Sequence, residues 1–368
     1  MKFIRRIPIS LCLLAAPSAA RAQATPEQLD VLFRPLVTEG SPGYAVGIVR
    51  CGILVLSRSY GLANLKTGVR ITTATDFRLA SLTKQFTATA IMLLVHEGRI
   101  RYDETLTAVF PEFPPYGSDI TIRQLLNHTS GLKDYEDIYS ELMLGTPSDK
   151  IPQITDAGVL ELLEQQDATL FAPGSRWQYS NSGYAVLAMI VERVSGKPFQ
   201  DFLQERVFRP LHMDHTVGFV PGRNQIPDRA YGYRQEKGEW TFSDQSPTSA
   251  VLGDGGVYSS IDDLVKWVDA LDRHTLLDAL EMEPAFTSVS VFGVESPDHA
   301  PAAYGFGWFL NPYKGHRRNW HYGETCGFLT AIQRFPDDQL TVIVLANRID
   351  ADPAPLALEI ADMYLNVK

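Results

Sequence analysis

The alternation of apolar and polar residues near both ends of the chain predicts strands there. Residues 44–61, YAVGIVRCGILVLSRSYG, form two β-rich runs that flank residues 50–52. Residues 327–348, GFLTAIQRFPDDQLTVIVLANR, form two further runs around residues 336–338. Two such runs joined by a short segment with Gly, Pro or Asp are typical of an antiparallel hairpin. We therefore expect one hairpin near each end of the chain.

The pattern between the two hairpins is mainly helical. It contains long runs without Gly or Pro, helix-opening residues and glycine stops. These signals predict helices at 85–97, after the capping box 121–124, at 182–194 and after 260–263. Further helices are expected near 25–40 and near 353–364.

An α/β (α+β) fold of the β-lactamase/transpeptidase-like layout accounts for this order of elements. The economical arrangement is one antiparallel sheet built from both terminal hairpins, flanked by helices, with a helical lobe inserted between them. We place the sheet lobe at about 23–76 and 290–368 and the helical lobe at about 77–289, within a single domain, 23–368. A cleft is expected where the lobe meets the sheet.

The first 22 residues have the pattern of a secretory signal. Lys2, Arg5 and Arg6 precede an apolar run that reaches Leu14, and small residues end the segment at Ala22. The apolar run is too short for a stable membrane anchor. We therefore expect cleavage after Ala22 and a periplasmic or secreted protein with no membrane span.

Composition and charge exclude one class of partner. The chain has 45% hydrophobic and 21% charged residues, which is typical of a globular protein, and its net charge is −10. Nucleic acid is excluded, because no surplus of basic residues exists to neutralise phosphates. Beyond the signal segment two cysteines remain, Cys51 and Cys326. The sequence leaves open whether they are free or paired, and it leaves the oligomeric state open.

The stretch DFRLASLTKQFTATAIMLL, residues 76–94, places Ser81 and Lys84 at the start of a predicted helix. Residues three apart lie on one helix face, so the Lys84 amine can reach the Ser81 hydroxyl. A serine becomes a nucleophile when a base takes its proton, and a lysine with a lowered pKa can serve. Ser81 and Lys84 are therefore candidate catalytic residues. The alternative is that Ser81 only caps the helix.

A second Ser-x-x-Lys occurs at Ser130 and Lys133. Gly131 follows that serine directly, in a segment typical of a turn, so no helix is expected to hold the pair together. The first pair is therefore the better candidate.

Two more motifs follow Ser81 and Lys84 along the chain. Residues 179–181, Tyr-Ser-Asn, come just before a predicted helix, and residues 321–323, His-Tyr-Gly, come just before a predicted strand. With three motifs in this order, the chain resembles the serine β-lactamase family, which includes class C β-lactamases, D-alanyl-D-alanine carboxypeptidases, related esterases and penicillin-binding-protein-like serine hydrolases. The resemblance covers nearly the whole chain after the signal, including LLNHTSGL at 125–132.

The resemblance implies a role for each motif residue. Ser81 would be the nucleophile, and Lys84 with Tyr179 would form the general base, without a decision on which of the two takes the proton. Asn181 would bind a substrate carbonyl. The backbone N–H groups of Ser81 and Glu324 would form the oxyanion hole. No metal and no cofactor is implied.

Residues His321, Tyr322 and Gly323 would contact the substrate, and two of them depart from the pattern of many β-lactamases. His321 stands where many carry lysine, so a positive charge for a substrate carboxylate becomes optional near neutral pH. If His321 supplies that charge, affinity for an anionic substrate should weaken as the pH rises through roughly 6 to 7. Tyr322 replaces a small or hydroxyl residue. Gly323 would let the strand approach the substrate closely.

The expected function is that of an exported serine hydrolase that acts through an acyl-enzyme on Ser81. Its partner would be a small-molecule or peptide acyl substrate: an amide, a peptide or a β-lactam-like compound. One alternative is a carboxylesterase of the same fold. An alternative of another class is a penicillin-binding receptor without efficient turnover.

Overall fold

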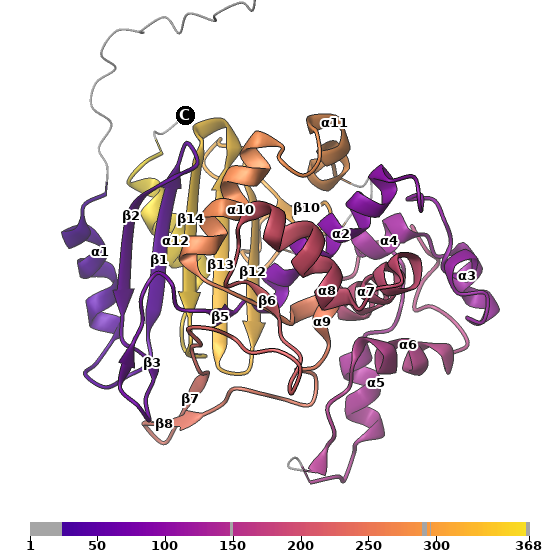
Figure 1. The fold of residues 1–368 in the computed structure, drawn as a ribbon, viewed down its shortest axis with the longest axis horizontal. Helices are drawn as coiled ribbons and strands as arrows, with labels where there is room; N and C mark the ends of the chain where they lie inside the picture. Colours follow the sequence, from indigo (N-terminus) through magenta and orange to yellow (C-terminus); the bar gives the residue numbers. More distant parts are fainter. Residues whose placement is uncertain (1–23, 148–149, 289–292, 295, 366–368) are drawn as a thin grey trace, which may run out of the picture.

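The computed structural model describes residues 24–147, 150–288, 293–294 and 296–365, so the expected signal segment 1–22 lies outside the described residues. A seven-stranded antiparallel sheet forms one side of the molecule, on the left in Figure 1. In spatial order the strands are β10 (Ala303–Tyr304), β11 (Phe309–Leu310), β12 (Asn319–Thr325), β13 (Phe328–Phe335), β14 (Leu340–Ala346), β1 (Tyr44–Arg50) and β2 (Ile53–Tyr60).

Both predicted hairpins are present, and they pair with each other. Strand β1 lies between β2 and β14, and Tyr44 at the start of β1 faces Ala346 at the end of β14. The predicted antiparallel sheet from the two ends of the chain is therefore confirmed. The sheet also contains β12, which carries residues 321–323, and two short strands next to it, β11 and β10, that the hydrophobic pattern did not predict.

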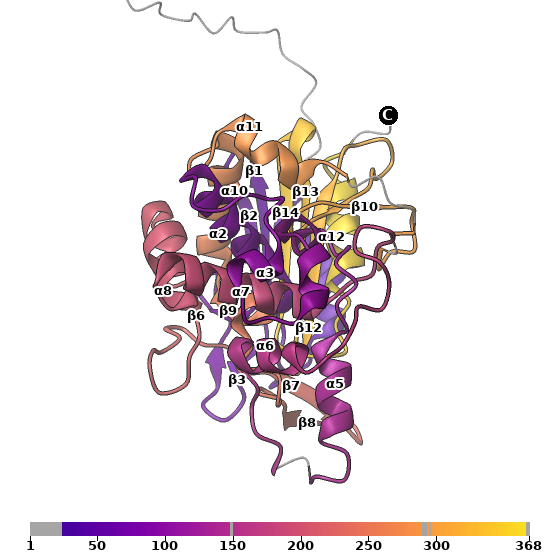
Figure 2. The ribbon, with the colours of Figure 1, turned by 90° about the vertical axis from the view of Figure 1, so that its right-hand side faces the viewer.

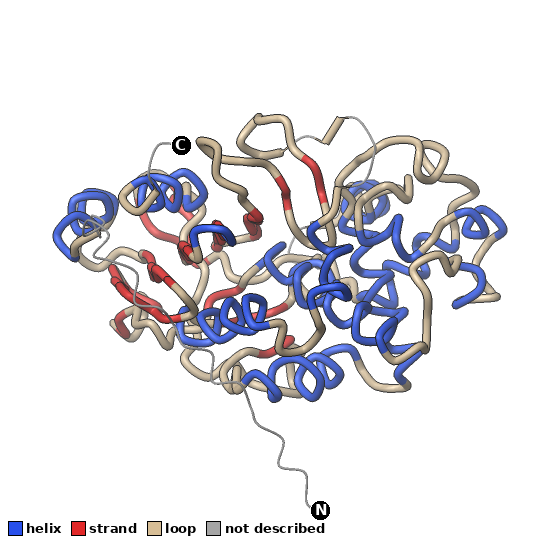
Figure 3. The backbone as a smooth tube through the Cα atoms, turned by 90° about the horizontal axis from the view of Figure 1, so that it is seen from above, coloured by secondary structure: helices blue, strands red, loops and turns tan. Residues whose placement is uncertain are grey.

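Helices cover both faces of the sheet, as seen from above in Figure 3. One face packs on α12 (Pro353–Asp362) and, near β2, on α1 (Pro26–Phe33), whereas the other face packs on α10 (Ile261–Arg273). Each strand contributes side chains to a hydrophobic core on each face of the sheet, because successive side chains point to opposite faces. Val342 and Val344 belong to the core under α1 and α12, and Ile343 belongs to the core on the α10 side.

The middle of the chain forms a helical region beside the sheet (Figure 1), and this region faces the viewer in Figure 2. Its helices are α2 (Lys84–His96), α3 (Leu106–Val109), α4 (Ile122–Leu126), α5 (Tyr135–Leu142), α6 (Asp156–Glu164), α7 (Asn181–Ser195), α8 (Phe199–Leu203), α9 (Leu252–Gly255) and α11 (Ala279–Met282). Thr121 caps α4 in the predicted capping box, and Gly196 ends α7 with φ +71°. Helix α2 is buried on all sides from Lys84 to Leu94, in contact with α7.

Three small sheets accompany the helices and were not predicted. They are β3 (Leu62–Asn64) with β4 (Val69–Arg70), β5 (Phe77–Arg78) with β9 (Val257–Ser259) and β6 (Val217–Gly218), and β7 (Tyr233–Glu236) with β8 (Glu239–Phe242). Strand β5 ends just before Ser81, so the sheet that it shares with β9 fixes the chain at that point.

Within the described part of the chain, no helix has both the length and the apolar character needed to cross a bilayer. Cys51 and Cys326 are both free, which resolves the question that the sequence left open.

Candidate active site

Ser81 lies in a 3₁₀ turn, Ala80–Thr83, directly before α2, and not in the first turn of the α-helix as the sequence predicted. The turn still brings the two motif residues together, since Lys84 Nζ lies 3.0 Å from Ser81 Oγ. Ala80 before the serine has φ +49°, a left-handed conformation that is uncommon for a residue with a side chain. The nucleophile candidate therefore follows a strained backbone position.

Lys84 is fully buried and makes three hydrogen bonds. Its Nζ donates to Ser81 Oγ, to Asn181 Oδ1 at 2.8 Å and to the backbone oxygen of Asp254 at 3.1 Å. Burial lowers the pKa of Lys84 to about 8, and the negative charge of Asp254 opposes that shift. An amine with this pKa exchanges its proton near neutral pH, as a general base requires.

Tyr179 completes the group around Ser81. Its ring centroid lies 4.9 Å from Lys84 Nζ, and its hydroxyl is hydrogen-bonded to Ser81. Burial raises the pKa of the Tyr179 phenol above its ordinary range, although the bond from Ser81 opposes the rise. Tyr179 is therefore a neutral phenol at neutral pH, while Asn181 holds Lys84 in place. The structure thus brings Ser81, Lys84, Tyr179 and Asn181 together.

Strand β12 approaches the Ser81 turn very closely, and Gly323 makes this approach possible. A Cβ atom on Gly323 would lie 2.2 Å from the backbone oxygen of Leu79 and 3.1 Å from Cβ of Ala80. The glycine is needed because the strand packs against the serine turn, and a contact between Gly323 and substrate stays a prediction. The next residue, Glu324, is the one whose N–H was predicted for the oxyanion hole.

His321 carries no charge for a substrate carboxylate, which corrects the expectation from the sequence. The ring is fully buried. Its Nδ1 donates to the carbonyl of Tyr322 at 2.6 Å, and its Nε2 accepts from the Tyr304 hydroxyl at 2.9 Å. Burial, together with the charge of Lys84, lowers the pKa of His321 to about 3. His321 is therefore neutral from about pH 4 upward, and the expected loss of affinity between pH 6 and 7 has no basis in this residue.

Sequence reasoning missed three buried neighbours of these residues. The centroid of the His128 ring lies 4.3 Å from that of the Tyr179 ring, with the two ring planes tilted by 35°, and His128 Nδ1 accepts a hydrogen bond from the backbone N–H of Ser180 at 3.2 Å. Tyr304 holds His321, and the Asp254 carboxylate accepts from the Tyr135 hydroxyl at 2.8 Å. His128 lies in LLNHTSGL, a segment that the resemblance to the family includes, but the sequence gives no role to this histidine.

A cavity of about 600 Å³ opens beside Tyr179. Half of the residues that line it are aromatic, namely Trp177, Tyr179, Phe309 and Tyr322, and Arg176, Gln178 and Pro297 are among the others. Ser81 is partly exposed, as a nucleophile must be to meet a substrate. The aromatic walls favour an apolar or aromatic group of the substrate.

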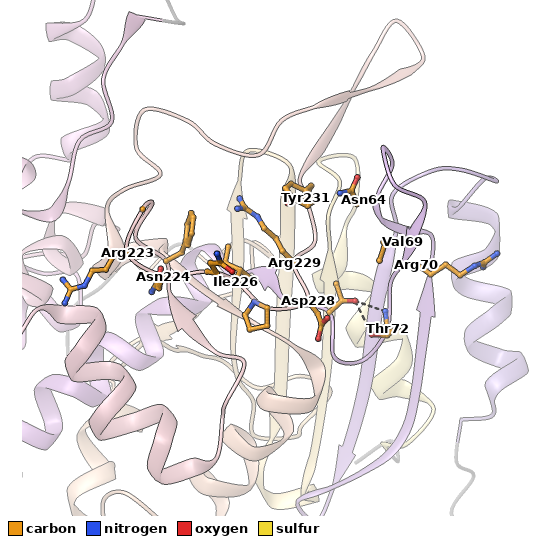
Figure 4. A pocket seen from close by; sticks show the side chains of 15 residues that line it. Asn64, Val69, Arg70, Thr72, Arg223, Asn224, Ile226, Asp228, Arg229 and Tyr231 are labelled. Carbon is orange, nitrogen blue, oxygen red and sulfur yellow. Dashed lines mark hydrogen bonds between the residues drawn. The ribbon is translucent and has the colours of Figure 1, made fainter.

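Another cavity, of about 750 Å³, lies between the segments 64–75 and 219–231 (Figure 4). Its lining is mixed and includes several charged side chains, with Arg70 and Arg223 at opposite ends and Arg229 and Asp228 between them. Its walls come from other segments than those that carry Ser81, Lys84 and Tyr179. Among the described residues, His, Cys, Asp and Glu form no cluster that could hold a metal ion.

The second Ser-x-x-Lys does not form a comparable pair. Lys133 Nζ donates to Gln166 at 2.8 Å, and Ser130 Oγ accepts from the backbone N–H of Leu132. The turn at Gly131, with φ +73°, separates the two side chains.

Comparison with known proteins agrees with this arrangement. The model of the family described as Beta-lactamase matches residues 29–363. The chain belongs to the β-lactamase family. It is 33% identical to penicillin-binding protein 4* of Bacillus subtilis (strain 168) over 338 residues, which cover 88% of this chain and 72% of that protein.

Two other relatives carry names that describe an activity. The D-aminopeptidase of Brucella ovis is 29% identical over 328 residues, which are 89% of this chain and 60% of that protein, so the chain spans only part of its length. The solved D-amino acid amidase of Ochrobactrum anthropi SV3, complexed with L-phenylalanine amide, superposes with a TM-score of 0.74 at 26% identity, over 91% of this chain and 96% of that one. This protein is a serine hydrolase with the predicted fold.

Proposed function

We propose that this serine hydrolase cleaves amides and short peptides of D-amino acids through an acyl-enzyme on Ser81. The observation that carries the proposal is the contact of 3.0 Å between Ser81 Oγ and a fully buried Lys84 amine. The relatives named D-aminopeptidase and D-amino acid amidase support the substrate class.

The proposed reaction begins with the neutral Lys84 amine. It takes the Ser81 proton, the serine oxygen attacks the amide carbon, and backbone N–H groups stabilise the oxyanion. The C–N bond then breaks, and Tyr179 passes a proton to the leaving nitrogen and regains one from Lys84. Water then attacks the acyl-enzyme, the same groups pass its proton back to Ser81, and the carboxylic acid leaves. Tyr179 acts as a proton relay here, since its raised pKa disfavours a phenolate as the initial base.

The charge around Lys84 favours a cationic substrate over an anionic one. Asp254, Asp134 and Glu136 all favour the charged form of Lys84, so the field at this position is negative. His321 is neutral and does not offset them. A negative field attracts the ammonium group of an amino acid amide and repels the carboxylate of a β-lactam. We therefore place amide hydrolysis ahead of β-lactam hydrolysis.

The test is to measure kcat/KM for D-alanine amide and L-alanine amide with the native protein and with Ser81→Ala. We expect a preference for the D-amide and a loss of about 10⁵-fold or more in Ser81→Ala. Ser130→Ala, from the second Ser-x-x-Lys, is the matched control and should keep the activity within about tenfold. Turnover of a nitrophenyl ester without any amide hydrolysis would replace the proposal with a carboxylesterase, and a persistent adduct without turnover would replace it with a penicillin-binding receptor.

We further propose that the protein acts outside the cytoplasm. The proposal is supported by the basic, apolar and small-residue order of residues 1–22. N-terminal sequencing of the protein recovered from the periplasm or culture medium should start at Gln23. Recovery from the cytoplasm with residue 1 or 2 first would contradict it.

A further inference from the structure

His128 follows α4 and holds the chain on both sides of Tyr179. Its backbone oxygen accepts a hydrogen bond from the N–H of Gln178 at 2.9 Å. Its ring Nδ1 accepts from the N–H of Ser180 at 3.2 Å. The residue before Tyr179 and the residue after it are therefore both hydrogen-bonded to the same histidine.

The His128 ring also packs directly on the Tyr179 ring. The two ring centroids lie 4.3 Å apart. On its other sides the His128 ring meets the rings of Tyr304 and Tyr184, whose centroids lie 4.6 Å and 5.2 Å away. The histidine is fully buried in this aromatic cluster. Because such packing leaves no free space, the Tyr179 ring cannot shift toward His128 without moving it.

The start of α7, which carries Asn181, lacks the usual side-chain cap. Ser180 occupies the N-cap position, but its side chain makes no cap hydrogen bond, and its Oγ has no partner in the described part of the chain. A serine at this position commonly fixes the start of a helix through that bond. Here the N–H of Ser180 is bound by His128, and the N–H of Asn181 by Asp134 Oδ2 at 2.7 Å. Contacts from the segment between α4 and α5 therefore fix the place of the motif 179–181.

The conformation and the charge of His128 suit this task. Its φ of +61° lies in the left-handed region, where histidine and asparagine occur more often than most residues with a side chain. Because the Ser180 N–H donates to Nδ1, the ring proton of the neutral histidine lies on Nε2. Burial, with a smaller effect of the charge of Lys84, lowers the pKa of His128 well below its ordinary value. Nδ1 is therefore a hydrogen-bond acceptor at neutral pH.

We propose that His128 is a positioning residue, which holds the Tyr179 phenol where it can pass a proton to the leaving group. It acts through Tyr179, because its own ring is buried behind that side chain. This inference rests on the proposed function, in which Tyr179 delivers the proton to the leaving nitrogen. His128 should then matter most for a leaving group that must be protonated, and little for one that departs as a stable anion.

The test compares three substrates that share one acyl group: D-alanine amide, D-alanine ethyl ester and D-alanine 4-nitrophenyl ester. The amide nitrogen and the ethoxide need a proton to leave, whereas 4-nitrophenolate leaves without one. His128→Phe keeps a ring beside Tyr179 but removes the acceptor for Ser180. Its kcat/KM should fall about 10²-fold for the amide and the ethyl ester, and less than about fivefold for the nitrophenyl ester.

His128→Asn is the conservative variant that should rescue the activity. Asparagine tolerates a positive φ, and its Oδ1 can accept from the Ser180 N–H in place of Nδ1. We expect kcat/KM for the amide within about fivefold of the native value. If His128→Phe does not fold, His128→Gly replaces it, because glycine is unstrained at this φ, and the same selective loss is expected.

His274→Phe is the matched control. His274 also has a positive φ, of +54°, but it is exposed at the C-terminal end of α10. The control thus imposes the same backbone strain outside the site and should keep the activity toward all three substrates.

A double mutant shows whether His128 acts through Tyr179. In Tyr179→Phe the proton donor is absent, so the addition of His128→Phe should cause no further loss of amide hydrolysis. Additive losses would overturn the positioning role. An equal loss toward all three substrates in His128→Phe, or an equal loss in His128→Asn and His128→Phe, would do the same.

The two esters separate this inference from the proposed function. If the native protein hydrolyses the esters but not the amide, the proposed function fails, while a selective loss of ethyl ester hydrolysis in His128→Phe still supports the positioning role. Amide hydrolysis without a selective loss in His128→Phe overturns the positioning role alone. A native protein that turns over none of the three substrates overturns both.

Discussion

Lys84 shows how burial gives one residue its chemistry. The ordinary pKa of a lysine keeps it protonated in water, but the fully buried Lys84 has a pKa lowered to about 8. The spacing of Ser81 and Lys84 predicted their contact, because neighbours on one helical face meet in almost any fold. The partners that tune Lys84, such as Asp254, are distant in the sequence and could not be predicted from it.

The pH profile of kcat tests the role of Lys84 as base. Activity should rise with pH and level off above about 8, because only the neutral amine accepts the Ser81 proton. The charged or titratable groups that act on Lys84 are Asp254, Asp134, Glu136 and Tyr322, and His128 and His321 respond to its charge. Asp254→Asn removes a negative charge that favours the ammonium form, so the midpoint should move to lower pH.

The control for this prediction is Glu161→Gln, an exposed acid on α6, which should leave the midpoint unchanged. A midpoint of the kcat profile that moves to higher pH in Asp254→Asn, or a kcat that does not change with pH near 8, would contradict the assignment of Lys84 as the base.

The charge state of His321 could not be predicted from the identity of the residue alone. The sequence placed a histidine at the third motif and predicted an optional positive charge. Tyr304, which holds Nε2 of His321, comes from a different strand, and the burial of the ring follows from the packing of both strands. A histidine is charged or neutral according to such contacts, which no local pattern contains.

At the scale of elements, the site depends on how closely β12 packs on the Ser81 turn. The glycine of the third motif was predicted from its position before a strand, but its reason is the contact with Leu79 and Ala80. The turn itself is 3₁₀ and not α-helical, and such a tightened turn is common at the start of an α-helix.

Gly323→Ala tests this packing. The added methyl group would lie 2.2 Å from the Leu79 oxygen, so β12 must move away from Ser81 and the predicted oxyanion N–H of Glu324 moves with it. We expect kcat to fall about 10²-fold or more, the usual effect of losing an oxyanion donor, with a smaller change in KM. Circular dichroism should show an intact fold, and an unchanged kcat would mean that the strand does not position the site.

At the scale of the whole molecule, Asn347 ties the two ends of the chain to the inserted segment. This fully buried residue follows β14. Its Oδ1 accepts from the backbone N–H of Gly43 at 2.8 Å, and its Nδ2 donates to the backbone oxygens of Leu62 at 3.0 Å and Tyr231 at 2.9 Å. The sequence predicted the hairpins through their alternation, but neither this junction nor the small sheets, whose strands of two to four residues carry little periodic signal.

Asn347→Ala should therefore destabilise the entire fold. It leaves three backbone groups without a partner, and at about 1 kcal/mol or more for each, the free energy of unfolding should fall by about 3 kcal/mol. Urea unfolding monitored by fluorescence measures this loss, and Glu161→Ala on the exposed face of α6 serves as the control. A loss below about 1 kcal/mol would show that the junction is not essential.

The measurement that tests the central claim most directly is labelling with an alkyl fluorophosphonate, which forms a stable bond only to an activated serine. Intact mass and peptide mapping after incubation should show one adduct, located on Ser81, whose rate of formation rises with pH through about 8. Ser81→Ala should remain unlabelled, and Ser130→Ala should label like the native protein. An adduct on another serine, or labelling that persists in Ser81→Ala, would contradict the assignment of Ser81 as the nucleophile.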